Sequence, residues 1–595
     1  MRRQRQWSKK KQVIRATHEA NQDARLRMAS FGFLGIAVII ILRLFALMVI
    51  QHDVYAQLAQ GSHELLAQLF PRRGSIYIQD VRSGERFPFA INRDVFTMYA
   101  DTREIENDEV AESIAEEVAA LFEYDEEKKL QLFIKLNKPN DPYEPIERKL
   151  EESFVEMVTE KEIPGIHFTR EQERFYPEKN LAAQVVGFVG KNETGSDTGR
   201  YGIEGYWQDE LAGSSGFFEG IRSAKGYSIP LAGKVFEQAR DGVDLTLTID
   251  RTLQYKACER LRVGLAEYGA SSASLIIMDP KTGAIRAMCS LPDFDPNLYS
   301  KVESIEQYNN TTIFTPYEPG SIFKPIAMAA AINEELLTPN SIFYDSGSKE
   351  GLCRTPIRNA NVKIYKDQTM TGVLENSINT GMVYVAEQLG KKKFRHYVEL
   401  FGFGTKEGLE LNSEISGTID TLSLNKGDDI DCYAATASFG QGITATPIQM
   451  TTAFSALANG GVLMKPYIVD EIHYPDGKVE KIRPVEIRSV VTPRTAALVS
   501  GMLVNVVDSG HAGLAKVAGY YVAGKTGTAQ IAGPGGYTEE TNHSFVGYAP
   551  VDDPTFVMIV KFEKPQRAFS ATTAAPVFGD IAKFLLQYYG VPPSR

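Results

Sequence analysis

Apolar residues form one long run near the amino terminus and only short, periodic groups after it. The run covers residues 29–50 and holds a single charge, Arg43. A helix of this length crosses roughly 30 Å of hydrocarbon, and Arg43 lies close enough to one end to reach the headgroups. We therefore predict a transmembrane helix over residues 29–50.

The distribution of charge orients this span. The chain has a net charge of −11, yet residues 1–28 hold nine Lys or Arg against two acidic residues, which with Arg43 leaves −19 for the part after Ile50. Because basic flanks stay in the cytoplasm, we expect residues 1–28 to be a cytoplasmic tail and the part after Ile50 to lie outside. That acidic part also argues against nucleic acid as a partner.

Two other interpretations of the amino terminus are weaker. A cleaved signal peptide would have a shorter basic region, a shorter apolar stretch and an A-x-A site after it, unlike this sequence. A basic arm that binds another surface is not needed, since the adjacent span already explains the tail. We therefore favour an uncleaved anchor.

Beyond the span, helical spacing dominates at first. Residues 51–70 continue as a helix, and residues 75–78 alternate like a strand. Residues 104–162 are acidic and have apolar positions three and four apart, as at Val110 and Ile114, which predicts helices. The charges of this stretch are most simply a solvated helix face.

From residue 241 onward, strands and helices both appear but do not alternate regularly. Hairpin-like pairs dominate, such as the two strands joined by the turn at residues 279–283. The predicted strands cover residues 245–249, 273–278, 284–290, 522–530, 544–549 and 555–562, and the predicted helices cover residues 251–267, 321–337 and 572–589. This pattern predicts an α+β fold with an antiparallel sheet.

The cysteines do not indicate a metal site. They are scattered, with no C-x-x-C pair and no histidine at metal-ligand spacing, at Cys258, Cys289, Cys353 and Cys432. They are buried thiols, or they form one or two disulfides, and the spacing does not decide between these states.

Three short motifs carry candidate chemistry: Ser321-Ile-Phe-Lys324, Ser377-Ile-Asn379 and Lys525-Thr-Gly527. Each pattern has further copies, which are Ser8/Lys11, Ser346/Lys349, Ser423/Lys426, Ser423/Asn425 and Lys281–Gly283. We set these copies aside by context. The first lies in the predicted cytoplasmic tail, the last in a hairpin turn, and the others in loops rather than at helix starts.

Ser321 and Lys324 suit nucleophilic catalysis. A helix is predicted to begin at Ser321, so the two side chains, three residues apart, share one face. A serine is a poor nucleophile until a base takes its proton. A lysine amine is such a base where burial and a helix N-terminus favour its neutral form. The plain alternative, a helix cap followed by a solvated lysine, is the better interpretation of this motif taken alone.

The second motif suits proton transfer and substrate binding. Ser377 could pass a proton to a leaving amine, and the Asn379 amide could hold a substrate carbonyl. The plain alternative is a loop pair, because Ser and Asn favour such positions anyway.

The third motif suits a carboxylate. Lys525 and the hydroxyls of Thr526 and Thr528 supply donors for one, and Gly527 would let a substrate backbone approach the strand. The plain alternative is a glycine bulge at a strand edge beside an exposed lysine.

In this order the three motifs are a known signature of penicillin-binding proteins and class A β-lactamases. With Ile378 rather than Asp in the second motif, the chain resembles the class B penicillin-binding proteins, the monofunctional transpeptidases of division and elongation. Further segments look like that family, namely Arg72–Gly74, Arg174–Pro177 with Val186–Gly190, Gly202–Gly205, and Gly440–Gly442 before Thr446-Pro447. One departure concerns the pedestal: many relatives carry Asp where this chain has Ile78, and Asp80 follows two residues later.

The resemblance implies four parts of the chain. They are the cytoplasmic tail (1–28), the transmembrane helix (29–50), an elongated pedestal or dimerisation domain (51–240) and a transpeptidase domain with an antiparallel sheet flanked by helices (241–591). It implies a serine-type peptidoglycan D,D-transpeptidase without a metal or organic cofactor, anchored in the bacterial inner membrane and closest to the division type.

The resemblance also implies roles for the motif residues. Ser321 would attack the D-Ala–D-Ala bond of a stem peptide with Lys324 as its base. Ser377 and Asn379 would assist, Lys525, Thr526, Gly527 and Thr528 would hold the terminal carboxylate, and the N–H groups of Ser321 and Thr528 would form the oxyanion hole. Expected partners are stem peptides, β-lactams as covalent inhibitors, a membrane glycan polymerase and other division proteins.

Three rival functions stay open at this point. An elongation-type transpeptidase has the same motifs. A β-lactamase or D,D-carboxypeptidase would gain nothing from the anchor and the large pedestal. A catalytically silent scaffold or β-lactam sensor would not need the intact motifs.

Overall fold

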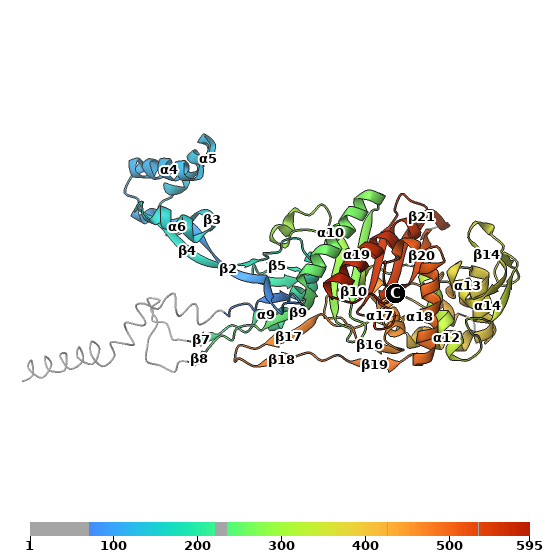
Figure 1. Ribbon diagram of the computed structural model, residues 1–595. Coiled ribbons are helices and arrows are strands. Elements are labelled where there is room, and N and C mark those ends of the chain that lie inside the picture. Colours follow the sequence, from blue (N-terminus) through green and yellow to red (C-terminus); the bar gives the residue numbers. More distant parts are fainter. Residues whose placement is uncertain (1–70, 220–234, 425–426, 534) are drawn as a thin grey trace, which may run out of the picture. The chain divides into compact units, whose positions relative to one another are not determined.

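The computed structural model (Figure 1) describes residues 71–219, 235–424, 427–533 and 535–595. The basic tail, the predicted span at residues 29–50 and the predicted helix at residues 51–70 lie outside these ranges. None of the helices within them has both the length and the apolar character that a membrane crossing requires.

Contacts divide the chain into two compact units. In the smaller unit, the described residues contain one antiparallel pair of strands, β7 (Phe217–Glu219) and β8 (Val235–Glu237). The larger unit comprises residues 73–213 and 241–595 and contains all the elements described below.

A seven-stranded sheet joins the two regions of the larger unit. Its strand order is β18-β17-β9-β1-β2-β3, and β4 pairs with β2; here β9 is Asp244–Asp250, β17 is Val469–His473 and β18 is Val479–Lys481. The pairing of β1 with β9 is parallel, with Ile76 opposite Leu245. The sheet therefore runs across the domain boundary predicted at residue 240.

The elements before residue 213 are β1 (Ile76–Gln79), β2 (Arg86–Ala100), η2 (Thr102–Glu104), α4 (Asp108–Phe122), α5 (Glu126–Leu136), β3 (Glu144–Leu150), α6 (Glu152–Thr159), β4 (Ile166–Phe175), α7 (Ala183–Val186), β5 (Phe188–Lys191), β6 (Asp197–Arg200), α8 (Gly202–Tyr206) and α9 (Gln208–Ala212).

The acidic stretch predicted as helical is helical only in part. The N-cap side chains of Asn107 and Asp125 start α4 and α5 by accepting hydrogen bonds from backbone N–H groups at 3.0 and 2.8 Å. The prediction is wrong for Glu144–Leu150, which form β3 beside β2. Prolines at 139, 142 and 145 disfavour a helix there, since each lacks a backbone N–H.

A fully buried carboxylate, Glu204, connects three of the family-like segments. It accepts hydrogen bonds from Arg73 Nε at 2.9 Å and from Arg174 Nε at 2.6 Å. Burial alone would raise the pKa of Glu204, but the two guanidinium groups hold it below its usual value. Arg174 also donates to Gly74 O at 2.8 Å and to Asn92 Oδ1 at 3.1 Å. One buried charge cluster thus fixes the strands β1, β2 and β4 against α8.

The unusual position of Asp80 does not remove its contact with the rest of the fold. Ile78, where many relatives have Asp, is a fully buried core residue. Asp80 accepts a hydrogen bond from Thr252 Oγ1, on the first turn of α10, at 3.0 Å. The carboxylate therefore still contacts the transpeptidase region.

The second region of the larger unit holds most of the elements. Its strands are β9 (Asp244–Asp250), β10 (Ser272–Met278), β11 (Ile285–Leu291), β12 (Ile342–Asp345), β13 (Ser348–Lys349), β14 (Ile357–Arg358), β15 (Lys366–Thr369), β16 (Val462–Met464), β17 (Val469–His473), β18 (Val479–Lys481), β19 (Glu486–Ser489), β20 (Ala523–Gly533), β21 (Gly536–Ala549) and β22 (Phe556–Glu563). Its α-helices are α10 (Arg251–Tyr268), α11 (Thr311–Phe314), α12 (Lys324–Asn333), α13 (Met370–Glu375), α14 (Asn379–Leu389), α15 (Lys391–Leu400), α16 (Cys432–Ala437), α17 (Pro447–Ala458), α18 (Pro493–Asp508) and α19 (Ala574–Tyr588). Its 3₁₀ helices are η3 (Pro296–Lys301), η4 (Ile305–Tyr308), η5 (Gly320–Phe323), η6 (Ala360–Val362), η7 (Asp420–Ser423), η8 (Gly513–Ala515) and η9 (Ser570–Thr572).

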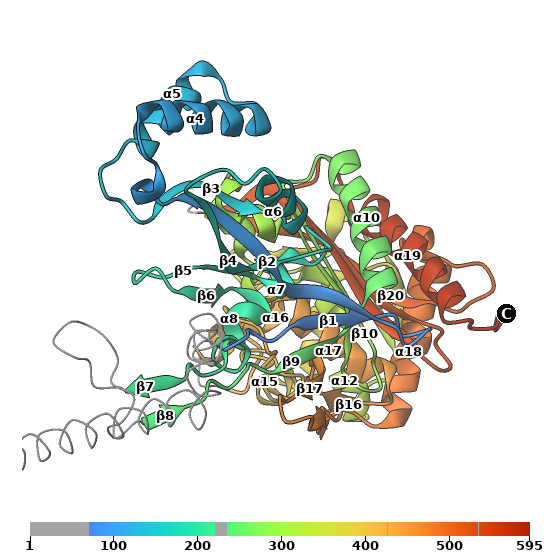
Figure 2. The same ribbon diagram turned by 90° about the vertical axis from the view of Figure 1, so that its left-hand side faces the viewer.

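The centre of this region is an antiparallel sheet with the strand order β11-β10-β22-β21-β20. Helices α10 and α19 pack together against it (Figure 2), and Phe578 of α19 contacts Phe545 with ring centroids 4.5 Å apart. Helices α17 and α18 also pack on the sheet, α18 against β20. The α+β prediction with an antiparallel sheet is confirmed, and β20 is left as an edge strand that can present side chains to a cleft.

Most predicted elements of this region agree with the structure to within a few residues. The helix predicted at residues 321–337 differs, because a 3₁₀ turn, η5, precedes α12, and α12 ends at Asn333. The four cysteines form two disulfides, Cys258–Cys289 and Cys353–Cys432. Of the two states that the sequence left open, buried thiols and disulfides, the structure shows disulfides.

The Glu204 cluster generates a stability prediction. Glu204→Gln leaves two largely buried guanidinium groups facing a neutral amide, so we expect a loss of about 3–5 kcal/mol in the free energy of unfolding. Urea titration of the full-length protein measures this loss. Glu399→Gln is the control, since its pair with Arg395 is an exposed i,i+4 contact on α15 and should cost no more than about 0.5 kcal/mol. Equal losses in the two variants would contradict the role given to the cluster.

Candidate functional site

A cavity of about 510 Å³ beside β20 gathers residues from all three motifs. Ser321, Ser377, Asn379, Thr526 and Thr528 line it, although the motifs lie 56 and 148 residues apart in the sequence. The two motif lysines, Lys324 and Lys525, are buried behind this lining. The structure thus brings together the candidate residues that the sequence singled out.

Ser321 lies in the 3₁₀ turn η5, directly before α12. Gly320 has a left-handed φ of +56° and donates its N–H to Gly440 O at 3.0 Å. A Cβ atom at Gly440 would lie 2.2 Å from Gly320 O, so this close approach requires glycine at position 440. Because a 3₁₀ helix has three residues per turn, the side chains of Ser321 and Lys324 project from the same line of the turn.

Lys324 connects the first motif to the second. Its Nζ donates to Ser377 O at 2.6 Å, to Ser377 Oγ at 3.1 Å and to Asn379 Oδ1 at 2.8 Å. Complete burial, and after it the charge of Lys525, bring the pKa of Lys324 well below its usual range. The positive N-terminus of α12, where Lys324 is the first residue, acts in the same direction. This environment shifts the balance of Lys324 from the ammonium towards the neutral amine.

Ser377 has a left-handed backbone with φ = +56°. For a residue with a Cβ atom this conformation costs on the order of 1–3 kcal/mol and persists only where the surroundings impose it. The short connection between α13 and α14 imposes it here. The Ser377 hydroxyl is thereby placed 3.1 Å from Lys324 Nζ and 3.1 Å from Lys525 Nζ.

Lys525 is not the exposed strand-edge lysine of the plain alternative. It is 1% exposed, and its Nζ donates to Ser377 Oγ at 3.1 Å and to Thr526 O at 3.2 Å. Burial lowers the pKa of Lys525 to about 7. The group therefore carries a full positive charge only below neutral pH.

Gly527 lies close to neighbouring segments of the chain. A Cβ atom there would lie 2.9 Å from Ile322 Cγ2 and 3.0 Å from Pro319 O. The close approach is thus between β20 and the segment that carries Ser321, so Gly527 brings the first and third motifs together. Thr528, next along the strand, donates from Oγ1 to Ser570 Oγ at 3.1 Å.

The copies of the motifs do not form a second site in the part of the chain that the structure covers. Ser346 Oγ bonds to Ser348 O at 2.9 Å, while Lys349 pairs with Glu387. Lys281 pairs with Asp553 at the surface. The copies that involve Ser8, Asn425 and Lys426 include positions outside the described ranges.

Several residues that line the cavity were not singled out from the sequence. They are Asn359, Ala360, Lys363, Tyr365, Asn376, Phe439, Gln441, His511, Phe569, Ser570, Ala571 and Thr572, beside Gly320 and Ala529. Gln441 is the one with a sequence signal, since it lies within a segment that looked like the family. The others come from loops whose arrival at the site depends on tertiary contacts.

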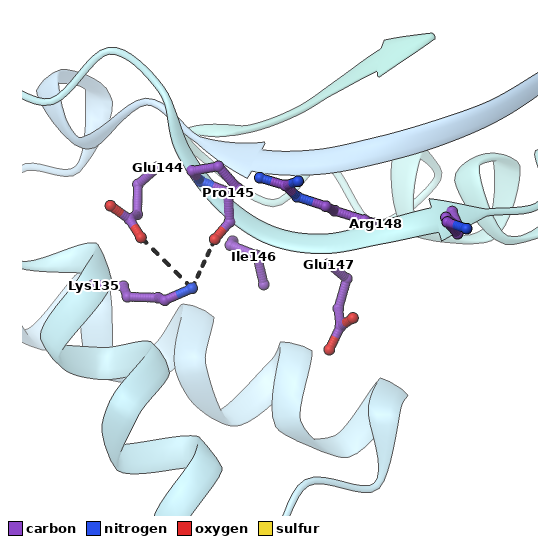
Figure 3. A pocket seen from close by; sticks show the side chains of 7 residues that line it. Lys135, Glu144, Pro145, Ile146, Glu147 and Arg148 are labelled. Carbon is purple, nitrogen blue, oxygen red and sulfur yellow. Dashed lines mark hydrogen bonds and ion pairs between the residues drawn. The ribbon is translucent and has the colours of Figure 1, made fainter. Parts of the chain in front are cut away.

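A second hollow lies on the pedestal region and lacks catalytic groups. It measures about 480 Å³ and is lined by Lys135 and the strand residues Glu144–Lys149. Figure 3 shows Lys135 pointing to Glu144 and Pro145, and its Nζ donates to Pro145 O at 2.8 Å. The lining contains no serine, cysteine or histidine, so the candidate site is the cavity at β20.

In the described ranges, no group of three or more His, Cys, Asp or Glu side chains is arranged to hold a metal ion.

Comparison with known families and proteins agrees with this geometry. Two family models match, "Penicillin binding protein transpeptidase domain" over residues 273–583 and "Penicillin-binding Protein dimerisation domain" over residues 68–247. Stage V sporulation protein D of Bacillus subtilis is 32% identical, with 97% of this chain and 88% of the relative covered. The Mesostigma viride protein named peptidoglycan D,D-transpeptidase FtsI homolog is 30% identical, with 95% and 97% covered.

A solved structure shows the same architecture. Penicillin-binding protein 3 of Mycobacterium tuberculosis, complexed with aztreonam, is 26% identical, with 88% of this chain and 98% of that chain covered and a TM-score of 0.66. Because the two matched domains together extend from residue 68 to residue 583, and relatives at 30% identity or more span nearly the whole length, this chain belongs to the class B penicillin-binding proteins and is a peptidoglycan D,D-transpeptidase.

Proposed function

We propose that Ser321 is the acylated nucleophile of this transpeptidase and that Lys324 is its general base. The observation that carries the proposal is the buried Lys324 amine, which lies one 3₁₀ turn after Ser321 and is bonded to the second motif. A lysine kept neutral by burial can take a proton that an ordinary, charged lysine cannot.

The reaction follows in two halves. The Ser321 hydroxyl gives its proton to Lys324 Nζ while its oxygen bonds to the carbonyl carbon of the penultimate D-Ala. The C–N bond then breaks, and the terminal D-Ala leaves as an amine that takes this proton. In the second half, the amine of a neighbouring stem peptide attacks the ester, a peptide bond forms, and Ser321 regains its proton. No redox step or cofactor is needed.

Ser377 connects the two lysines in this scheme. Its hydroxyl accepts a hydrogen bond from the Lys525 ammonium and, when Lys324 is neutral, can donate its own hydrogen to the lone pair of Lys324. The three groups form a relay through which the proton taken from Ser321 reaches the leaving amine. Asn379 Oδ1 accepts a hydrogen bond from Lys324 Nζ. Asn379 also lines the cavity, where its side chain can assist substrate binding.

The terminal carboxylate would lie at Thr526 and Thr528, next to Lys525. Both threonines line the cavity, and Gly527 between them keeps β20 close to Ser321. The N–H groups of Ser321 and Thr528 would bind the oxyanion, as in the family that the motifs resemble.

We further propose that the enzyme acts at the division septum from a single-pass anchor in the inner membrane, with its catalytic region outside the cytoplasm. The apolar run at residues 29–50 and the basic residues 1–28 support the anchor and its orientation. The pedestal resembles the division type, and one relative is named as an FtsI homolog. A membrane glycan polymerase and other division proteins are the partners that such a role requires.

The first prediction from the proposed function concerns the nucleophile. Incubating the full-length protein with benzylpenicillin should add one ligand mass to the proteolytic peptide that contains Ser321, as read by mass spectrometry. Ser321→Ala should abolish the label, because no other hydroxyl in the cavity is placed one turn before a buried lysine. Ser346→Ala, an S-x-x-K copy in an exposed loop, is the matched control and should label like wild type. A label on Ser346 would overturn the assignment.

A second prediction uses the lowered pKa of Lys525. The ammonium is present below pH about 7 and lost above it, so the second-order rate of acylation by benzylpenicillin, an anion, should fall as the pH rises through that value. At low pH, protonation of Lys324 removes the general base, so the acylation rate should also fall on the acid side of the pH profile. Lys525→Arg stays charged and should move the alkaline limb upward. If this limb lies at the same pH in the Arg variant, Lys525 is not the group that titrates.

A third prediction separates cross-linking from hydrolysis. A transpeptidase must keep its acyl-enzyme until an amine arrives, so the penicilloyl form should persist for many minutes after free drug is removed. A β-lactamase would hydrolyse the penicilloyl form in less than about one second at ordinary turnover rates. Intact mass measured over time gives the answer. Rapid recovery with repeated turnover would favour hydrolysis.

A further inference from the structure

The loop of residues 359–365 forms part of the wall of the cavity. Asn359, Ala360, Lys363 and Tyr365 all line the cavity, and the 3₁₀ turn η6 lies between the ends of the loop. No motif of the sequence includes this loop, and the mechanism above does not use it.

A buried carboxylate fixes the 359–365 loop at both ends. Asp345 is fully buried at the end of β12. Its Oδ1 and Oδ2 accept hydrogen bonds from Asn359 Nδ2 at 3.0 and 2.9 Å, and Oδ2 also accepts one from the Tyr365 N–H at 2.8 Å. Asn359 Nδ2 donates to Lys363 O at 3.1 Å. The backbone that carries Lys363 is therefore held in place before any ligand arrives.

The same carboxylate connects the loop to the second motif. Thr380, which follows Asn379, donates from Oγ1 to Asp345 Oδ1 at 2.6 Å. Asn379 Nδ2 donates to Arg358 O, just before the loop, at 3.0 Å. The position of the loop is thus set relative to the catalytic residues.

The side chain of Lys363 is exposed and held at the cavity wall. Its ammonium lies 4.4 Å from the ring centroid of Tyr365, a cation–π contact. His511 lines the cavity as well, and its pKa is lowered by burial and then by the charges of Lys525 and Lys363, with Glu375 acting in the opposite sense. Both lysines are therefore close enough to His511 for their charges to act on it.

Lys525 alone is a poor counter-charge for an anionic ligand. It is buried, it already donates to Ser377 Oγ and Thr526 O, and it is fully charged only below neutral pH. A carboxylate at Thr526 and Thr528 would gain from a second cation that keeps its contact with water.

We infer that Lys363 is a specificity-determining residue that pairs with the terminal carboxylate of the donor stem peptide, held for this purpose by the Asp345-anchored loop. The inference rests on the proposed function, since it assigns a further residue to the same donor site. An exposed cation at the cavity wall selects anionic ligands chiefly by speeding their approach and binding.

The test compares two acylating probes that differ in one charge, benzylpenicillin and its methyl ester, on the full-length protein. In Lys363→Gln, the acylation rate with the acid should fall roughly three- to fivefold at low salt, while the rate with the ester stays unchanged. Lys363→Arg should keep the preference for the acid. Lys366→Gln removes an exposed lysine three residues away, outside the cavity lining, and should leave both rates as in wild type.

The outcomes separate this inference from the proposed function. If wild type is not acylated at Ser321 by either probe, the proposed function fails. If wild type is acylated but Lys363→Gln changes the acid and ester rates by the same factor, or changes neither, the inference alone is wrong. If Lys366→Gln loses the preference for the acid as Lys363→Gln does, the inference is also wrong, because the loss then reflects a general effect of surface charge.

Discussion

The desolvation of Lys324 is the constraint on which the catalytic site depends. A lysine with no access to water favours its neutral form, but its amine must still find hydrogen-bond partners. The second motif supplies them, through Ser377 and Asn379. The left-handed backbone of Ser377 places its hydroxyl beside this amine, and the packing of β20 against η5 at Gly527 brings the third motif next to the first.

Two other buried charges organise the rest of the larger unit. Glu204 holds two arginines and thereby fixes the pedestal strands, while Asp345 holds the 359–365 loop against α14. Each is a carboxylate surrounded by donors, an arrangement that is costly to break once buried. Such centres define position more sharply than apolar contacts do, since a hydrogen bond tolerates only small changes in distance and angle.

The sequence predicted the architecture in its strongly patterned parts. Most of the strands and helices that we predicted after residue 241 were placed closely, because alternation and capping signals there agree with the burial of one face. Among the exceptions are β21, which begins at Gly536 rather than at residue 544, and the elements between residues 342 and 508, for which no bounds were predicted. The stretch at residues 104–162 was misjudged at β3, whose partner β2 is distant in sequence and could not be inferred from local spacing. The disulfides were equally out of reach, since cysteine spacing does not specify pairing.

By itself, the sequence determined which residue types are available for catalysis. Through their order along the chain it named Ser321, Lys324, Ser377, Asn379 and the motif that begins at Lys525. Only the tertiary structure decided what those residues are chemically. Whether a lysine is a solvated cation or a neutral base depends on water access and on neighbouring charges, and both are set by segments that the chain brings together from far apart. The same reason explains why the cavity wall at residues 359–365 carried no sequence signal.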